Sequence, residues 1–550
     1  MSTLPPSHSS PNRLDLPSHE QCLRNSDLLQ EILHHIPSEA DRSHLKAQRQ
    51  SLLWIALTCK DFSPSGIKFL WRTLDNLLPL LCLLPSFTLR DGMYRFVRAV
   101  QHREWESFDR HAALIKEIRY FANPSDQMAP SVYVILALHS PRILPNVERF
   151  VCRDLFRALQ IPVSEMLLYA QAPLQYIEIR DSPGTMGSTF MFSLPANPPH
   201  ISCLILVGQP LSTLDDVTPL EHLVSLEVRC MSRIGIEIAL LKTFLHRIGS
   251  LPRLRSFTAD STCFHAATDT APPLVEPPVE PAGFFKLLTH LHFEGNIADT
   301  NGAIPAFLRN IATKEVRSLT LRHTGDRRAL QPGTRGLVRG GCSRAGGSVV
   351  HTESRGDILY TIAEWWSATL WQLDLELDDG RSFKSVYNFL ALLSALRNLN
   401  VLGSVEPFPN LESAELKFVC AKLPHLETLS VQSHDSSGTY IPWAMRCITE
   451  LVGISTKLRE LAIPLGFAEL PPLSSARPAK NLKHLTVYAS KPITDPIALA
   501  RYLDCLFPCL NSLRYESSSG GGIELEAAWA QVRELMFAFQ DVWRRALASV

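Results

Sequence analysis

The sequence predicts an α/β protein that consists of a small helical module at the N-terminus and a long array of strand–helix units. Three observations lead to this prediction. The chain has 550 residues, which exceeds what one hydrophobic core usually supports, so it must divide into domains or grow by repetition. A leucine-rich motif recurs along most of its length. Three short amphipathic patterns precede the first motif and indicate helices.

The composition is that of a folded soluble protein, with 45% hydrophobic and 20% charged residues. The 54 basic and 54 acidic side chains balance, so no broad positive field exists and we expect neither nucleic acid nor a membrane as partner. The start has no secretory signal pattern, and no span reaches the roughly 20 apolar residues that cross a bilayer. We therefore expect a soluble protein of the cytoplasm or nucleus.

The 12 cysteines are scattered and form none of the close Cys-x-x-Cys pairs that hold zinc. This pattern fits a reducing compartment. Only Cys505 and Cys509 are near neighbours, in the apolar stretch 502–513, and we expect both to be buried as small hydrophobes.

Three helical patterns follow a Ser- and Pro-rich tail, residues 1–18, which we expect to be disordered. The first is an apolar stripe with spacings of three and four that ends before Pro37: Leu28, Leu29, Ile32, Leu33 and Ile36. After a polar connection over 39–50, the second comprises Leu53, Ala56, Leu57 and Phe62, with Ser63-Pro64 as a breaker. The third comprises Ile67, Leu70, Trp71 and Leu74.

Three helices of this length make a core that is marginal unless a partner or a neighbouring domain covers its apolar faces. We therefore predict that some of these side chains contact a partner. The candidate docking residues are Leu28, Ile32, Leu57, Phe62 and Trp71. The alternative is an ordinary three-helix start that caps the first repeat.

The same residues carry a family resemblance. Segments 27–36 (DLLQEILHHI), 56–62 (ALTCKDF) and 69–74 (FLWRTL) resemble an F-box in order and spacing. Segment 77–85 resembles the region after the box in the F-box proteins of mushroom-forming fungi. That family opens with Leu-Pro, where this chain has Ser26-Asp27. The resemblance covers residues 19–90 and implies that the helices bind the Skp-type adaptor of a cullin-based ubiquitin ligase.

Beyond residue 145 the pattern Leu-x-x-Leu-x-Leu recurs, generally after Pro or Lys. Its central residues alternate with polar ones, as a strand with one buried face requires. The motifs begin at Leu174, Ile201, Leu223, Leu254, Leu288, Val316, Leu370, Leu411, Leu426, Leu458, Leu482 and Leu510.

The first five steps are 27, 22, 31, 34 and 28 residues, near the roughly 20 to 29 residues of a leucine-rich repeat. We therefore predict an irregular leucine-rich-repeat solenoid over 146–548, after a helical linker or cap over 91–145. Segments such as 236–248 and 386–396 read as its helices. The usual Asn or Cys after the strand is missing from nearly every motif, so the array is divergent. A helix over 523–548, with an apolar face from Trp529 to Trp543, is predicted to cover the last repeat.

Two segments interrupt the motifs. Residues 271–281 contain five prolines and should form an extended loop. Residues 325–356 are rich in Gly and Arg without periodicity, which indicates a disordered insertion or an error in the gene model. Six arginines there make a basic arm for nucleic acid conceivable, but stacking aromatics are absent and a solvated insertion is favoured.

Motifs for catalysis, cofactors and metals are missing. The chain has no Gly-Lys-Ser or Gly-Lys-Thr, no Gly-x-Ser-x-Gly and no His-Glu-x-x-His. Asp374 to Gly380 resembles a calcium loop faintly, but the glycine is misplaced, and a strand 373–377 with an Asp-Gly turn is favoured. His34-His35 lacks partners at ligand spacing and reads as part of a helix. We therefore expect no enzyme activity, no cofactor and no metal.

These observations predict a substrate-recognition subunit of a cullin ubiquitin ligase. The helical module would bind the Skp-type adaptor and through it the cullin, and the concave face of the repeats would bind a target protein. Two alternatives stay open: a scaffold that binds the adaptor without any role in ubiquitination, and an enzyme whose site is assembled from distant repeats.

Overall fold

The computed structural model describes most of the helical and strand segments. The described residues are 26–34, 42–120, 127–140, 142–152, 163–180, 186–194, 200–208, 220–229, 247–260, 285–294, 304, 307–308, 311, 313, 315–322, 353–376, 393–404, 413–431, 443–467, 470–472, 478–489, 493–517 and 523–548. The chain forms two compact units, Met1–Ile201 and Ser202–Val550. Each unit is described separately.

The first unit opens with three helices: α2 (Ser26–His34), α3 (Arg42–Thr58) and α4 (Ser63–Arg72). Both α2 and α3 lie against α4. The buried side chains are Leu29 and Leu33 from α2, and Leu52 and Ala56 from α3. Gly66 of α4 permits close approach, because a Cβ built there would lie 2.8 Å from the Ala56 Cβ.

The bounds of two helices differ from the prediction. Helix α3 begins at Arg42, within the segment that we predicted to be a polar connection. Its first turns have few apolar residues, so the apolar periodicity that predicts a helix appears only from Leu52 on. Ser63-Pro64 begins α4 and does not interrupt a helix, since proline fits the first turn, where no N–H bond is lost.

Four parallel strands follow in the first unit: β1 (Thr73–Leu74), β4 (Glu117–Tyr120), β5 (Arg149–Cys152) and β6 (Tyr176–Arg180). Consecutive members of this series pair in register. Leu74, which we placed in the third helix, is therefore a strand residue. The strand β4 lies in segment 91–145, which we expected to be a helical linker or cap, so parallel pairing begins before residue 146.

Helices alternate with these strands: α5 (Leu78–Leu81), α6 (His102–Ala112), α7 (Pro130–His139), α8 (Val163–Ala170) and α9 (Met186–Ser193). A hairpin of β2 (Phe87–Arg90) and β3 (Met93–Phe96) precedes α6. Its two-residue turn, Asp91-Gly92, has positive φ at both positions, which is the conformation that Asp-Gly favours in tight hairpins.

The second unit repeats the same arrangement. Its strands are β7 (Cys203–Val207), β8 (Ser225–Arg229), β9 (Ser256–Asp260), β10 (His290–Glu294), β11 (Ser318–Arg322), β12 (Gln372–Glu376), β13 (Val401–Ser404), β14 (Thr428–Val431), β15 (Trp443–Ala444), β16 (Glu460–Gly466), β17 (His484–Ala489) and β18 (Ser512–Ser517). They pair in sequence order and in parallel, except that β14 pairs directly with β16 and β15 lies against β16 alone.

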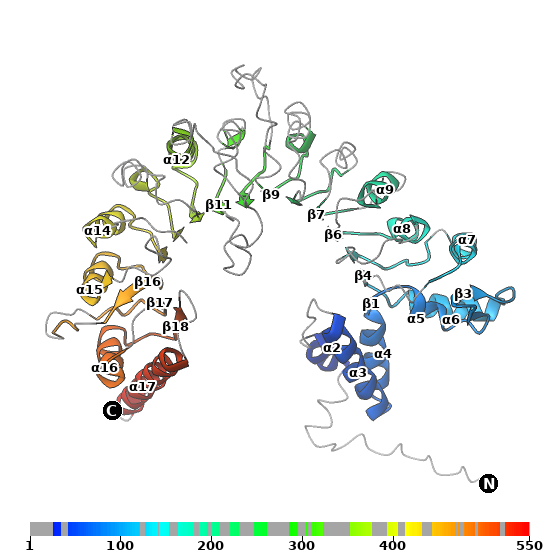
Figure 1. Ribbon diagram of the computed structural model, residues 1–550, viewed down its shortest axis with the longest axis horizontal. Coiled ribbons are helices and arrows are strands. Elements are labelled where there is room, and N and C mark those ends of the chain that lie inside the picture. Colours follow the sequence, from blue (N-terminus) through cyan, green and yellow to red (C-terminus); the bar gives the residue numbers. More distant parts are fainter. Residues whose placement is uncertain are drawn as a thin grey trace, which may run out of the picture. The chain divides into compact units, whose positions relative to one another are not determined.

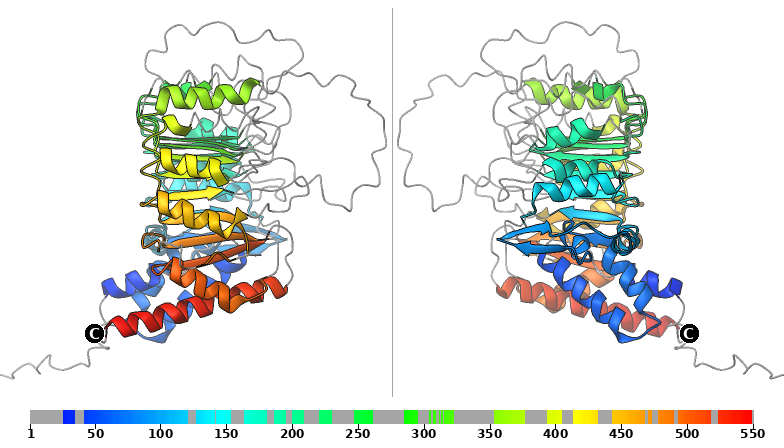
Figure 2. Two further views of the ribbon diagram at one scale, coloured as in Figure 1. Left: turned by 90° about the vertical axis from the view of Figure 1, so that its left-hand side faces the viewer. Right: turned by 90° about the vertical axis from the view of Figure 1, so that its right-hand side faces the viewer.

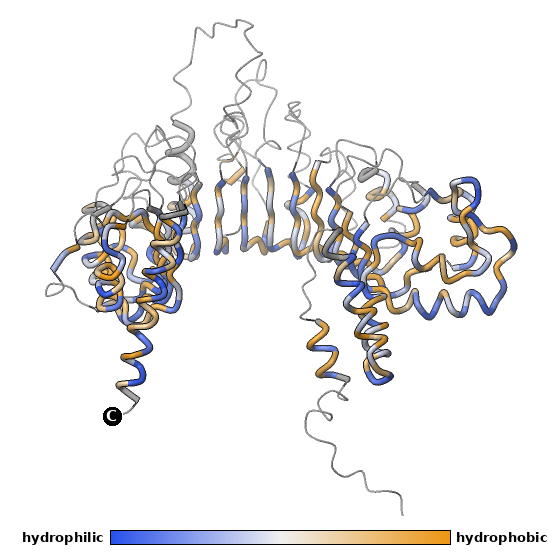
Figure 3. The backbone as a smooth tube through the Cα atoms, turned by 60° about the horizontal axis from the view of Figure 1, so that its bottom comes forward, coloured by the Kyte–Doolittle hydropathy of each residue, from blue (hydrophilic) through white to orange (hydrophobic). Residues whose placement is uncertain are grey.

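The named helices of this unit are α12 (Glu353–Trp366), α14 (Ser413–Lys422), α15 (Met445–Ile454), α16 (Pro496–Leu506) and α17 (Ile523–Ala548). Within each unit the helices cover one side of the strands (Figures 1 and 2). Apolar and polar residues alternate along the strands of the second unit (Figure 3), so one row of side chains enters the core and the next stays outside.

The motif explains this packing residue by residue. In β8, Leu223, Leu226 and Val228 are buried, whereas Glu227 faces outward. The turn before each strand binds the preceding turn: the N–H groups of Arg255 and Ser256 both donate to the carbonyl of Val224, at 2.8 and 3.0 Å. Arg255 O accepts the same pair of bonds from the next repeat. The predicted α/β class and leucine-rich-repeat-like solenoid are confirmed.

Several strand predictions were wrong or missing. The repeat strand predicted at the Leu411 motif is wrong, because residues from Ser413 on form α14. The strands β4, β5 and β13 were not predicted. Cys505 and Cys509 are exposed, not buried, because α16 turns Leu499 and Leu503 inward.

Other predictions can be checked only in part. Helix α12 begins at Glu353, inside the expected insertion. The remainder of that insertion, the tail 1–18, the proline loop, His35 and segment 236–246 lie outside the described residues. The predicted terminal helix exists as α17. Its apolar face is buried at Trp529, Val532 and Met536 and exposed at Val542 and Trp543.

Candidate protein-docking surface

The exposed side of α3 carries a ridge of large apolar side chains. Trp54 and Leu57 are 63% and 69% exposed, and Leu53 beside them is also exposed. Their spacing of three and four residues sets them along one face of the helix. The opposite face carries Leu52 and Ala56, which are buried. Helix α3 therefore has two apolar faces, of which the helical module itself covers one.

A groove of about 300 Å³ runs beside this ridge. It is lined by Lys46, Arg49, Gln50, Leu53, Trp54, Leu57 and Leu70. Four of the seven lining residues are large and apolar, which suits a partner that offers apolar side chains. We call Leu53, Trp54 and Leu57 with this groove the α3 ridge.

Helix α2 adds a second exposed apolar pair. Leu28 and Ile32, one turn apart, are exposed, while Leu29 and Leu33 are buried. The helix is fixed to α4 by its buried side and by a hydrogen bond from Lys68 Nζ to Gln30 Oε1, at 3.1 Å. Together with the α3 ridge, α2 therefore leaves five large apolar side chains exposed on the described part of this small module. Such clusters of exposed apolar side chains are typical of an interface.

The five predicted docking residues divide into two groups. Leu28, Ile32 and Leu57 are exposed, whereas Phe62 and Trp71 are half-buried. The Trp71 ring lies 4.8 Å from the His111 ring of α6, so it serves packing within the chain. Leu53 and Trp54 were not among the predicted docking residues. The sequence signal for their exposure is a second apolar stripe on the helix. This stripe can be assigned to the surface once Leu52 and Ala56 are known to be buried.

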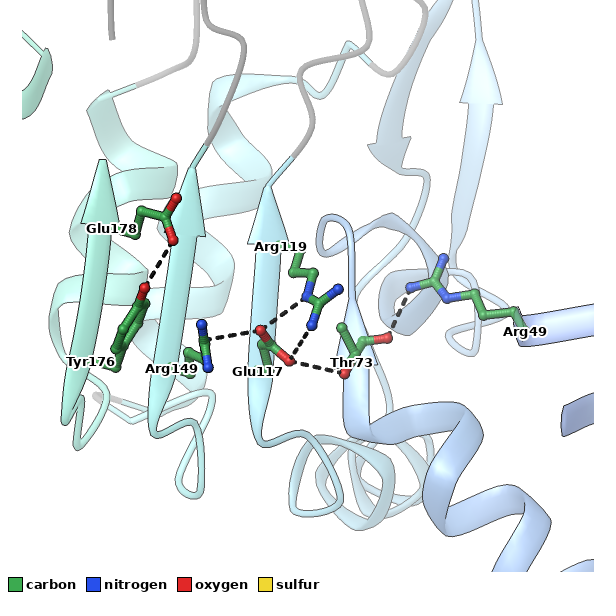
Figure 4. A network of polar contacts seen from close by, with 7 residues as sticks. All are labelled: Arg49, Thr73, Glu117, Arg119, Arg149, Tyr176 and Glu178. Atoms are coloured by element: carbon green, nitrogen blue, oxygen red, sulfur yellow. Dashed lines mark hydrogen bonds and ion pairs between the residues drawn. The ribbon is translucent and has the colours of Figure 1, made fainter. Parts of the chain in front are cut away.

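Arg49, which lines the groove of the α3 ridge, forms hydrogen bonds to the first repeat strand, β1, and to the residue after it. Its guanidinium donates to the Thr73 carbonyl and to Asp75 Oδ1, both at 3.0 Å. Thr73 Oγ1 in turn donates to Glu117 Oε2 at 3.4 Å. Figure 4 shows Arg49, Thr73 and Glu117 joined by these contacts across the first strands.

These contacts continue along the outward side chains of the next strands. Glu117 is bound by Arg119 Nε at 2.9 Å and by Arg149 Nε at 3.2 Å. The Arg149 guanidinium lies 3.9 Å from the centre of the Tyr176 ring, and the Tyr176 hydroxyl donates to Glu178 Oε2 at 2.9 Å. Charge-assisted bonds of this kind fix side-chain directions, and through Arg49 they connect α3 to the first strands.

The outward row of the second unit is polar. Glu227, Thr258, His292, Thr320 and Asp374 occupy matching positions on β8 to β12. Arg229 bridges Glu227 and Glu294, at 2.7 and 2.8 Å, and burial lowers the pKa of His292. A face of this kind, rich in hydrogen-bonding groups and poor in large apolar ones, suits a polar protein surface.

Asp374 is part of the strand β12, as the favoured interpretation of its segment predicted. Its carboxylate accepts hydrogen bonds from Gln372 Nε2 at 2.8 Å and from Thr320 Oγ1 at 3.5 Å. The residues after 376 lie outside the described part, so the turn itself is untested.

A buried carboxylate of the first unit, Glu165, has a structural role. Glu165 of α8 accepts hydrogen bonds from the Tyr133 and Tyr169 hydroxyls, at 3.0 and 2.7 Å. Burial, with the Glu165 charge, raises the pKa of both tyrosines above the usual range. The cluster lies under the helices and joins α7 to α8, and it stabilises this packing.

Within the described ranges, no group of three or more His, Cys, Asp or Glu side chains has the arrangement to hold a metal ion. Among the same residues, no helix combines the length and apolarity needed to cross a membrane.

Comparisons with known proteins return matches among solved structures alone. No protein-family model matches the chain, and no curated protein matches it in sequence. Solved structures with similar folds include Rad7 in complex with Elc1 from yeast, at 13% identity over 72% of this chain and 85% of that chain, with a TM-score of 0.38.

Two further structures are TLR13 in its complex with ssRNA13 and the leucine-rich repeat-containing protein LegL7 from Legionella pneumophila. TLR13 is 12% identical over 73% of this chain and 41% of that chain, with a TM-score of 0.29. LegL7 is 14% identical over 66% of this chain and 90% of that chain, with a TM-score of 0.28. All three scores are low, and nothing about the partners of this chain follows from them.

Proposed function

We propose that this protein is a non-catalytic interaction subunit whose helical module docks onto an adaptor protein and whose repeats bind a target. The observation that carries the proposal is the α3 ridge, where Trp54 and Leu57 are more than half exposed although the module has few residues to bury. Leaving two such side chains in water costs several kcal/mol in lost burial, on the order of 1.5 to 3 kcal/mol each.

The F-box resemblance of residues 19–90 suggests the partner, a Skp-type adaptor, and through it a cullin ubiquitin ligase. Its role would be to position the target, because proximity alone raises the effective concentration of target lysines near an activated ubiquitin. The polar network through Arg49, Thr73 and Glu117 supports this role, since it fixes the direction of the docking helices on the first strands.

The test is a double variant on the ridge, Trp54→Ala with Leu57→Asp. Both side chains are exposed, so the fold should survive while the apolar contact is lost. We expect the recovery of a recombinant Skp-type adaptor in affinity purification to fall by about tenfold or more, as for an interface hot spot. Trp71→Ala is unsuitable, because that ring contacts His111.

The matched control is Leu138→Asp on α7, where the leucine is 81% exposed and lies outside the module. This variant should recover the adaptor like the unmodified chain. Undiminished recovery with the double variant, with an unchanged circular dichroism spectrum, would contradict the proposal. Purification with and without proteasome inhibition then separates a ligase subunit, whose target accumulates on inhibition, from a scaffold, whose partners do not change.

A further inference from the structure

A second groove lies at the other end of the chain, between α16 and α17. It has a volume of about 330 Å³ and is lined by Arg501, Asp504, Cys505, Phe539, Val542 and Trp543. This volume is near the lower limit of the roughly 300 to 1,000 Å³ found for ligand sites. The groove is therefore of a size to take one long side chain.

Asp504 is the unusual member of this groove. It is only 7% exposed, yet no described residue donates a hydrogen bond to its carboxylate or forms an ion pair with it. Burial raises the pKa of Asp504, and no neighbouring cation offsets this effect. Most of the Asp504 side chain is covered, and its carboxylate reaches solvent through the groove that it lines. A carboxylate in this position can accept hydrogen bonds from a cation that enters the groove.

The nearest cation of the groove is engaged elsewhere. The Arg501 guanidinium lies over the Phe539 ring, 6.0 Å from its centre, and it forms no ion pair with Asp504 one turn along the helix. The remaining wall is apolar and aromatic, with Trp543 64% exposed. Aromatic faces and a desolvated carboxylate together attract an organic cation, whereas an anion would meet the Asp504 charge.

We propose that this groove binds the lysine or arginine side chain of a partner protein, with its alkyl part against Phe539, Val542 and Trp543 and its cationic end on Asp504. The amphipathic shape of these two side chains fits an apolar wall with one charge at its end. This site is independent of the α3 ridge, and neither proposal requires the other.

Cys505 supplies a direct test, because its exposed thiol lines the groove. The full chain is equilibrated with equal amounts of cystamine and 2-hydroxyethyl disulfide, each in the presence of the corresponding free thiol, so that thiol–disulfide exchange reaches equilibrium. A mixed disulfide at Cys505 then places either an ammonium or a hydroxyl group of similar size in the groove. Cys509, also exposed but not part of the groove lining, is the internal reference. Tandem mass spectrometry resolves the two positions on their shared peptide.

We expect the ratio of aminoethyl to hydroxyethyl adduct to be about threefold to tenfold higher at Cys505 than at Cys509, as for a partly buried charge pair. Asp504→Asn should lower the Cys505 ratio to that of Cys509. Arg501→Gln should raise it, because it removes a repelling charge. The midpoint of thermal unfolding should not be lower for Asp504→Asn than for the unmodified chain, since the substitution removes an unpaired charge.

Two results would overturn the proposal. The first is an adduct experiment in which both cysteines give the same ratio, or in which the Cys505 preference persists in Asp504→Asn. The second is a dimer of the unmodified chain, seen by sedimentation and abolished by Val542→Asp, because a second copy of the chain would then occupy the groove. A monomer with the predicted preference at Cys505 supports the proposal.

Discussion

Gly66 marks the tightest contact of the helical module. A Cβ at this position would lie 2.8 Å from the Ala56 Cβ and 2.9 Å from its Cα, so α3 and α4 have to separate in Gly66→Ala. We expect this variant to lose about 1 to 3 kcal/mol of stability by overpacking. Chemical denaturation followed by circular dichroism measures the loss.

Gly453 near the end of α15 is the matched control, because a Cβ there meets nothing within 4 Å. Gly453→Ala should raise stability by up to about 1 kcal/mol, since alanine favours the helix. Equal effects of the two substitutions would show that helix propensity decides both, and that α3 and α4 are not in close contact at Gly66.

Residue exposure could be predicted only in part from the sequence. Helix α3 carries Leu52, Leu53, Trp54, Ala56 and Leu57, and this set forms two stripes of nearly equal apolarity. Periodicity alone does not tell which stripe faces the core. The tertiary contact with Gly66 decides it, because only Ala56 is small enough for the crossing. Leu57 was therefore among the predicted docking residues and Trp54 was not, although both are exposed.

At the scale of elements, α14 offers a test of which of its side chains face the core. Val419 is buried and Phe418 beside it is exposed. We expect Val419→Asp to cost about 3 kcal/mol or more, because a charge enters the core. Phe418→Asp should cost less than about 1 kcal/mol, although it removes the contact of Lys422 Nζ with the ring, at 5.5 Å. Thermal unfolding of both variants distinguishes these outcomes.

The error at α14 has a physical cause. Leu411-x-x-Ala414-x-Leu416 satisfies the spacing of a repeat strand, yet the buried residues continue as Leu416, Val419, Cys420 and Leu423, which is a helical period. The true strand, β13, lies earlier and ends in Ser404. Strands β4 and β5 were overlooked because Ile118, Tyr120, Phe150 and Cys152 replace the leucines. Where leucine fills the motif, as in β8 or β17, strand positions were correctly predicted.

At the scale of the whole molecule, both units obey one rule. Among the described residues the repeat strands of each unit pair in sequence order, β15 excepted, and the turns before them bind the preceding turns, so the repeats are stabilised mainly by their neighbours. Such an array needs protected ends. The N-terminal helices leave apolar side chains exposed at the α3 ridge, whereas the last repeat is covered by α17. The exposed apolar side chains of the first end are the basis of the docking that we propose.

The covering role of α17 leads to the last prediction. Trp529 stacks on Tyr515 of β18, with ring centres 5.5 Å apart, and meets Phe467 at 5.1 Å. Val532 and Met536 are fully buried beside it, and Gln540 Nε2 donates to the Phe507 carbonyl at 3.1 Å. A chain that ends at residue 522 loses these contacts and bares the core of the last repeat. Burial of the tryptophan alone is worth about 3 to 5 kcal/mol.

For the chain that ends at residue 522 we expect a lower midpoint of thermal unfolding and aggregation in size-exclusion chromatography. A chain that ends at residue 541 removes only the exposed part of the helix and should unfold like the complete chain. Equal stability of the two truncations would show that the last repeat does not need α17 as its cover.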